Sequence, residues 1–162
     1  MLRLVLVDVT FSEVVSGIVR ESFKKQAEEL GLSAEEHSGF AAFETAEDVK
    51  SRMRGGDRVV LAYSGANSVG TISFCVDSEQ PLKGYIKRLA VLPEFRGRGF
   101  GGELMSYAEG QLKRLGVSRI ELAIVKRFKP LQRFYEQLGY VPTETRSYPF
   151  LPFEVLYLEK HV

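Results

Sequence analysis

The pattern of apolar and polar positions changes period several times along the chain, and its first part predicts a strand followed by a helix. Leu2 to Val9 is apolar and rich in β-branched residues, as strands are. Ser12 can cap a helix whose apolar positions recur every three or four residues, and Gly31 favours the end of that helix. The apolar face of this helix consists of Val15, Ile18, Val19, Phe23, Ala27 and Leu30.

The central part of the chain predicts a short helix and then a β-hairpin. Residues 32–56 have the least regular pattern, but Thr45 and Asp48 stand at the spacing of a capping box, and a glycine pair follows the helix that they begin. Two strand patterns, at 58–63 and 68–76, are joined by a Ser-Gly-Ala-Asn segment. This turn chemistry is typical of a hairpin between antiparallel strands.

The C-terminal half alternates strands with helices. The expected elements are a strand at 85–91, a helix from a glycine-rich loop to Gly116, a strand at 120–125, a helix from Pro130 to Gly139, and strands near 140–148 and 153–158. The predicted order is therefore β-α-α-β-β-β-α-β-α-β-β. Because the strand-helix-strand unit over 85–125 implies a parallel pair and the hairpins are antiparallel, we expect a mixed sheet.

Composition restricts the range of functions. The chain has 162 residues, of which 44% are hydrophobic and 27% are charged, and no repeat or low-complexity tract interrupts it. A single domain over residues 1–162 is therefore expected. The net charge of +1 creates no overall field that would attract nucleic acid or a membrane surface, so we expect neither as a partner. The first residues favour a strand over a signal peptide, and we expect a cytoplasmic protein.

Metal and disulfide chemistry are not expected. Cys75 is the single cysteine, which excludes an intramolecular disulfide. His37 and His161 stand far apart in the sequence, with no carboxylate or cysteine at ligand spacing around them.

The glycine-rich loop Arg96-Gly97-Arg98-Gly99-Phe100-Gly101-Gly102 lies between a strand and a helix. Glycines allow positive φ and close approach to a ligand, and the amides at a helix N-terminus favour an anion such as a pyrophosphate. An exposed tight turn is the plainer interpretation, but it explains one glycine better than this cluster. The spacing also matches a dinucleotide fingerprint with Glu121 downstream. A nicotinamide fold, however, places this loop after its first strand.

The wider segment, residues 89–101, resembles the signature of the GNAT superfamily of N-acyltransferases, which has L-x-V, a proline and then R/Q-x-x-G-x-G/A. Residues 134–140, Phe-Tyr-Glu-Gln-Leu-Gly-Tyr, resemble the family's Y-x-x-x-G-F/Y element, and the predicted element order is also that of the family. The resemblance implies an α/β fold with a mixed, splayed sheet flanked by helices. It also implies an acetyltransferase that binds acetyl-CoA between the strands at 85–91 and 120–125.

By the same resemblance, the loop amides anchor CoA, and the bulged strand before the loop pairs with pantetheine. The implied CoA-binding residues are Leu89, Ala90, Val91, Arg96, Gly97, Arg98, Gly99, Phe100, Gly101 and Gly102. The amide of Val91 is expected to bind the thioester carbonyl, and Tyr135 to protonate the departing thiolate. A primary amine would attack the thioester directly, because no Cys/His or Ser/His pair suggests a covalent intermediate.

Several assignments stay open on the sequence alone. The general base is unassigned, with Tyr85, Glu121 and a water chain as alternatives. Phe128 stands where relatives often have an asparagine near the pantetheine. The acceptor can be a small-molecule amine or a protein amine, and relatives are often homodimers. A non-catalytic acyl-CoA-binding domain is the alternative function.

Aromatic residues are concentrated in two stretches that the resemblance places near the acceptor. Phe40 and Phe43 lie in the irregular stretch, and Tyr148, Phe150 and Phe153 lie between the last two strands. Packing within the core or at a dimer surface is the first interpretation of these residues. An apolar environment for the acceptor is the second.

Overall fold

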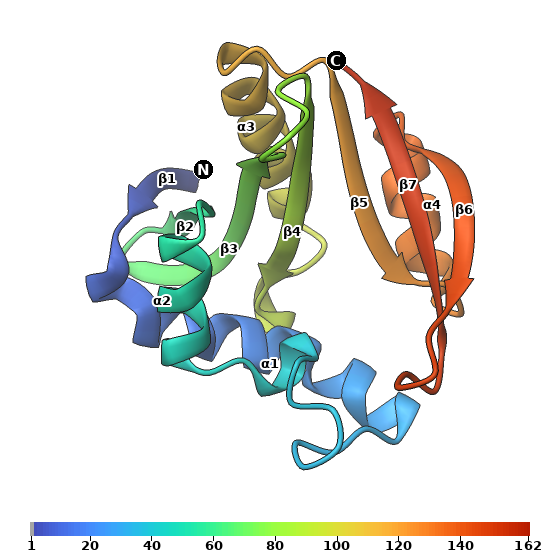
Figure 1. The fold of residues 1–162 in the computed structure, drawn as a ribbon. Coiled ribbons are helices and arrows are strands. Elements are labelled where there is room, and N and C mark those ends of the chain that lie inside the picture. The colour runs from blue at the N-terminus through green and yellow to red at the C-terminus, as the bar shows by residue number, and fades with distance from the viewer. Residues whose placement is uncertain (1) are drawn as a thin grey trace.

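The computed structural model describes residues 2–162 and has the predicted order of helices and strands (Figure 1). The elements are β1 Leu2–Val7, α1 Ser12–Leu30, α2 Ala46–Arg54, β2 Arg58–Ser64, β3 Asn67–Val76, β4 Lys83–Val91, α3 Phe100–Arg114, β5 Arg119–Val125, α4 Lys129–Gln137, β6 Val141–Ser147 and β7 Glu154–His161. Within this part of the chain, no helix combines the length and the apolar character needed to cross a membrane.

The strands of the described residues form one mixed sheet of seven strands in the order β1-β2-β3-β4-β5-β7-β6. Only β4 and β5 run parallel, as the strand-helix-strand unit predicts, and every other neighbouring pair is antiparallel. The last hairpin folds back so that β7, and not β6, lies beside β5.

The sheet is splayed between its two halves. β4 pairs with β5 only at the start of both strands, from Lys83 opposite Arg119 to Tyr85 opposite Glu121. Beyond these pairs the strands diverge toward their C-terminal ends, and α1 crosses near the open end (Figure 1). The expected splayed sheet is therefore confirmed.

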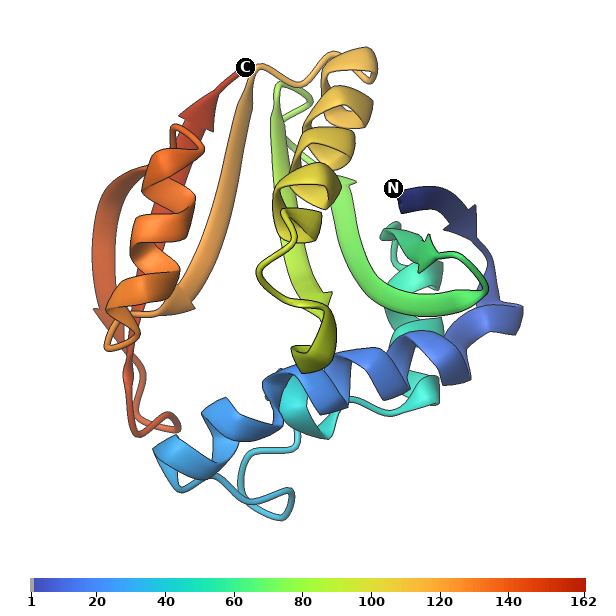
Figure 2. The same ribbon diagram turned by 180° about the vertical axis from the view of Figure 1, so that it is seen from behind.

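Each face of the sheet has its own apolar cluster. α3 and α4 cover one face (Figure 2), where Leu104 and Leu112 of α3 pack against Ile86 and Ile120. On the other face, Val15 and Val19 of α1 pack with Val49 of α2 against β2. Side chains alternate along a strand. Tyr85 and Lys87, beside Ile86, and Glu121, beside Ile120, therefore point away from α3.

Local sequence explains most of the helix ends. Thr45 and Asp48 form the predicted capping box of α2, each side chain accepting from the other residue's backbone amide. Gly31 ends α1 in the left-handed region, as predicted. The prediction that Ser12 caps α1 is wrong: Ser12 is the first residue of the helix, and its hydroxyl donates to the carbonyl of Val9. The first strand was expected to reach Val9, but β1 stops at Val7. A short 3-10 turn follows at Val9–Phe11.

Candidate functional site

A cleft of about 1370 Å³ occupies the opening between the two halves of the sheet. One wall is β4 from Tyr85 to Val91 together with the glycine-rich loop, and the other is β5 from Glu121 to Val125 together with α4. Of the expected CoA-binding residues, Ala90, which is buried, and Arg98 do not line the cleft. The C-terminal half of α1 and the segments before α2 and β7 close one end. The cleft therefore lies between the strands where the sequence predicted it.

β4 carries a bulge in the wall of this cleft. The register of β3 against β4 shifts between Thr71 and Ser73, so that one residue of β3 faces two residues of β4, Arg88 and Leu89. Arg88 has φ 55, the one positive value at a non-glycine position in residues 2–162. A bulge leaves ladder groups unpaired and turns the strand, which provides free main-chain groups in the cleft.

Five charged side chains form a continuous chain of ion pairs at this bulge, which we call the bulge network. Lys87 Nζ lies 3.0 Å from Asp57 Oδ1, and Arg88 Nε donates to Glu44 Oε2 at 2.9 Å. Arg52 of α2 joins the two carboxylates, with distances of 2.7 Å to Glu44 and 3.1 Å to Asp57. The side chains of Glu44 and Asp57 are 2% and 6% exposed. Sequence reasoning missed the whole network, because its members lie in α2, in the segments on either side of α2, and in β4.

The glycine-rich loop has the backbone that an anion site requires. Gly97 and Gly99 have φ 77 and 80, and a Cβ on either would meet no protein atom within 4 Å. Gly99 is the N-cap of α3, so the free amides of the first turn point outward with the positive end of the helix dipole. These residues fit a pyrophosphate, which can approach the backbone without a side chain in the way.

The absence of a side chain matters at Gly101 for a different reason than at Gly97 and Gly99. A Cβ at Gly101 would lie 3.2 Å from Cζ of Phe134, which is tighter than an ordinary contact. Glycine here lets the aromatic ring of α4 pack against the start of α3. The two helices thereby approach each other at the mouth of the cleft, where both line it.

The two arginines of the loop have different surroundings. Arg96 Nε donates to the carbonyl of Val91 at 3.1 Å, and its Nη2 donates to the carbonyl of Ser22 at 2.9 Å. Arg96 therefore ties the end of β4 to α1. The guanidinium of Arg98 lies 5.2 Å from the ring centroid of Phe95, and Arg98 has no ion pair among residues 2–162. Arg98 is the arginine whose charge remains available to an anion.

Tyr135 lies on α4, is 7% exposed and lines the cleft. Its ring packs edge-on against Phe134 and Tyr140, with centroids 5.0 and 6.0 Å away. Burial raises the pKa of its hydroxyl above the ordinary value. The phenol therefore stays protonated at neutral pH, as a proton donor must.

The two residues considered as a base lie opposite each other at the paired start of β4 and β5, and both line the cleft. The hydroxyl of Tyr85 donates to Asp77 Oδ2 at 2.6 Å, and this bond raises the pKa of Tyr85 to about 12. Tyr85 is thus a poor base. Glu121 keeps a carboxylate 20% exposed, with Lys83 Nζ at 3.5 Å.

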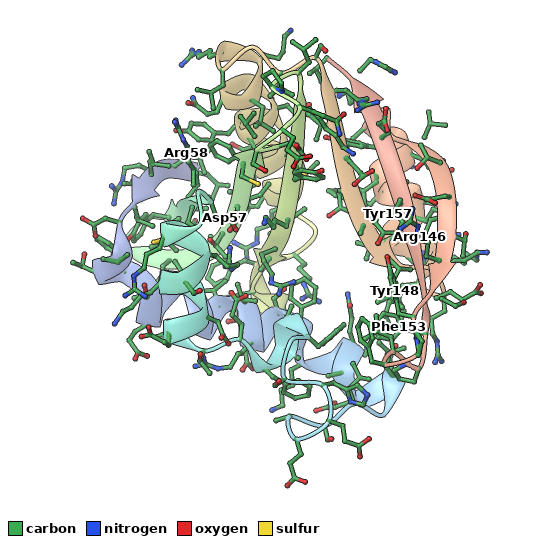
Figure 3. The ribbon with its side chains drawn as sticks, viewed as in Figure 1. Asp57, Arg58, Arg146, Tyr148, Phe153 and Tyr157 are labelled. Atoms are coloured by element: carbon green, nitrogen blue, oxygen red, sulfur yellow. The ribbon has the colours of Figure 1, made fainter. Side chains whose placement is uncertain are left out.

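Aromatic side chains from α1 and from the segments before α2 and β7 meet at the open end of the cleft. Phe40 packs edge-on against Phe23 of α1 and against Phe153, with centroids 6.3 and 5.9 Å away. The hydroxyls of Tyr148 and Tyr157 share a hydrogen bond. Figure 3 shows Tyr157, Tyr148 and Phe153 in succession along the β7 side, with Phe153 nearest to α1. Phe40 and Phe153 pack together and also line the cleft.

The other expected residues divide between the cleft and its surroundings. Phe128 is the N-cap residue of α4 and lines the cleft, so an aromatic ring stands where relatives often have an amide. Phe150 is 70% exposed at the rim. Cys75 is a free, half-buried residue of β3, and burial raises the pKa of its thiol. The described residues contain no group of three or more metal-ligating side chains.

Comparison with known sequences gives a match to one family. Residues 19–140 match the sequence model of the Acetyltransferase (GNAT) family. An N-alpha-acetyltransferase MAK3 of Arabidopsis thaliana is 32% identical over 82 residues, which are 50% of this chain and 43% of that protein. An aminoalkylphosphonate N-acetyltransferase of Salmonella typhimurium is 33% identical over 63 residues, which are 39% of this chain and 41% of that protein. The matches thus cover less than half the length of these two relatives.

The fold as a whole also has a solved counterpart. The PaiA N-acetyltransferase of Thermoplasma acidophilum, solved in complex with coenzyme A, superposes with a TM-score of 0.81 at 18% sequence identity. The superposition covers 100% of this chain and 99% of the other.

Proposed function

Because the chain belongs to the Acetyltransferase (GNAT) family, we propose that it transfers an acetyl group from acetyl-CoA to a primary amine held in its cleft. The observation that carries the proposal is the opening between β4 and β5, which has the positive-φ glycine loop at its mouth and Tyr135 in its wall. Both sequence relatives carry the names of N-acetyltransferases, which supports an amine as the acceptor.

In this proposal the loop and the bulged strand hold the donor. The amides of residues 98–102 bind the pyrophosphate, and Arg98 adds a positive charge beside it. Main-chain groups of Leu89 to Val91 pair with the pantetheine chain, and the Val91 amide donates to the thioester carbonyl. Such a donor typically stabilises a developing oxyanion by about 3 kcal/mol. Support comes from the bulge at Arg88 and from Arg96, which fixes the end of the strand.

The reaction itself is a direct displacement. The lone pair of the amine nitrogen attacks the carbonyl carbon, a C–N bond forms, and the C–S bond breaks. Tyr135 donates its proton to the departing thiolate, and the nitrogen loses one proton, so that the products are an amide and a thiol. We assign Glu121 as the acceptor of the amine proton through a chain of water molecules, because Glu121 faces Tyr85, six residues before Val91 on β4. Of the two candidate bases, it is the one that carries a carboxylate, and it lines the cleft.

Ligand binding and turnover together test this function. Acetyl-CoA at one hundred times its dissociation constant should stabilise the fold by about 2.7 kcal/mol, which a thermal shift detects, whereas NAD should have no effect. Acetylation of a panel of primary amines, followed by release of free thiol, should then be observed. Stabilisation by NAD but not by CoA would contradict the proposal. Stabilisation by acetyl-CoA without acetylation of any amine would favour a non-catalytic acyl-CoA-binding domain.

A further inference from the structure

The bulge network carries one positive charge that its own carboxylates do not neutralise. It joins three cations, Arg52, Lys87 and Arg88, to two carboxylates. The carboxylates are buried, whereas the side chains of Lys87 and Arg88 are 42% and 29% exposed. Both of these cations line the cleft. The excess charge is therefore presented to the cleft through two consecutive residues of β4.

Both cations keep unused hydrogen-bond donors. Arg88 donates through Nε to Glu44 and through Nη2, at 3.4 Å, to the carbonyl of Gly39, while its Nη1 has no partner among residues 2–162. Lys87 has a single ion pair, to Asp57 at 3.0 Å, although an ammonium has three donors. A guanidinium beside an ammonium is suited to a carboxylate, phosphonate or phosphate group.

The position of these cations suits an acceptor for the reaction proposed above. Lys87 and Arg88 stand on β4 between the paired start of that strand and Val91, whose amide is assigned to the thioester carbonyl. Val91 is three residues beyond Arg88 on the same wall of the cleft. An acceptor held there by an anionic group can extend its amine toward the thioester.

We propose that Lys87 and Arg88 bind an anionic group of the acceptor, so that the acceptor is a small amine that carries a carboxylate, phosphonate or phosphate. The proposal rests on the acetyl transfer proposed above and adds the substrate class. Because Lys87 and Arg88 are already oriented by buried carboxylates, little side-chain freedom is lost when the anion binds.

Matched pairs of amines test the proposal. Phenylalanine and phenethylamine differ by a carboxylate, and 2-aminoethylphosphonate and ethylamine differ by a phosphonate. The anionic member of each pair should have the higher kcat/KM, by about tenfold or more, as expected for charge-assisted hydrogen bonds. Lys87→Met should reduce this preference toward unity, and Lys87→Arg should restore it. Lys113→Met, a charge removal on the exposed last turn of α3, should leave the preference unchanged.

Two results would overturn the proposal. One is equal or better use, by the wild-type protein, of the amines that lack an anionic group. The other is a rise in the KM for acetyl-CoA in Lys87→Met with no change in amine preference, which would assign these cations to the donor. Calorimetric binding of phenylalanine and phenethylamine to the CoA complex gives a readout without turnover. Tighter binding of phenylalanine without acetylation would support the anion site and contradict acetyl transfer, so the two failures can be distinguished.

Discussion

Tyr135 lines the cleft and is protonated at neutral pH, as a proton donor to a thiolate must be, although the burial that raises its pKa also makes it a weaker acid. Tyr135→Phe removes the hydroxyl and leaves the edge-on packing against Phe134 and Tyr140 in place. We therefore expect kcat to fall by about 10²- to 10⁴-fold, the range of general acid catalysis, with little change in acetyl-CoA affinity. Steady-state kinetics and calorimetry measure the two quantities.

The control is Tyr107→Phe on α3, which removes a hydroxyl from a partly buried tyrosine outside the cleft lining. This variant should retain wild-type turnover. If Tyr135→Phe also retained it, another group or water would have to protonate the thiolate.

The hydrogen bond between Tyr85 and Asp77 leads to a prediction about stability at acid pH. The hydrogen bond from Tyr85 is the largest cause that lowers the pKa of Asp77 to about 2 from 3.8. A carboxyl with a lowered folded-state pKa contributes stability that is present above pH 3.8 and is lost as the pH falls toward 2. Tyr85→Phe should raise the pKa of Asp77 toward 3.8 and remove part of this contribution.

Carbon-13 NMR of the carboxyl groups, with urea unfolding at a series of pH values, measures both effects. Tyr63→Phe, on β2, is the matched control and should leave the Asp77 titration unchanged. An unaltered pKa of Asp77 in Tyr85→Phe would show that the backbone amides of Glu79 and Gln80 alone hold the carboxylate.

Sequence could locate residues whose role depends on neighbours in the chain. Gly99 and Tyr135 belong to local motifs, so their place at the cleft followed from the resemblance. Glu44 and Arg52 belong to no motif, and their meaning depends on ion pairs that connect β4 with residues far from it in the sequence. No local pattern specifies such pairs, and for this reason the bulge network appeared only in the structure.

At the scale of elements, the loop before α3 allows a paired test. Gly99 has φ 80, where an alanine is strained by about 1–2 kcal/mol, so Gly99→Ala should destabilise the fold and weaken acetyl-CoA binding. Gly110 lies in the interior of α3 without a positive φ, and a Cβ there would meet no atom within 4 Å. Gly110→Ala should therefore stabilise the protein by up to about 1 kcal/mol.

Urea unfolding and calorimetric titration with acetyl-CoA measure the pair. A Gly99→Ala protein as stable as the wild type, with unchanged affinity, would mean that the loop tolerates a side chain and does not need positive φ at this position.

The elements themselves were largely predictable, since their apolar periods and end residues agree with the local structure that forms. The correct order of the eleven α-helices and strands of residues 2–162 follows from this agreement. Two features did not follow. The place of β7 between β5 and β6 depends on long-range pairing. The resemblance implied a bulge in the strand before the loop, but its position at Arg88, with a positive φ and an ion-pair network around it, came only from the structure.

At the scale of the whole molecule, the two halves of the sheet are joined by a short stretch of strand pairing and by the apolar cluster under α3 and α4. Three residue pairs connect β4 to β5, and Phe40 contacts Phe153 across the open end. The glycine-rich loop belongs to one half, and α4 with Tyr135 belongs to the other. A ligand that fills the cleft between them adds contacts to both halves at once.

Acetyl-CoA should therefore slow hydrogen exchange in both walls of the cleft, since binding stabilises the closed arrangement of the two halves against local opening. We expect increased protection of amides at 97–102 and also at 121–135, whereas β1 and β2, far from the cleft, should change little. Exchange followed by mass spectrometry with acetyl-CoA, and with NAD as the control ligand, measures the effect. Protection confined to the glycine-rich loop would show that the donor is held by one half alone, and the splayed opening would then not be its binding site.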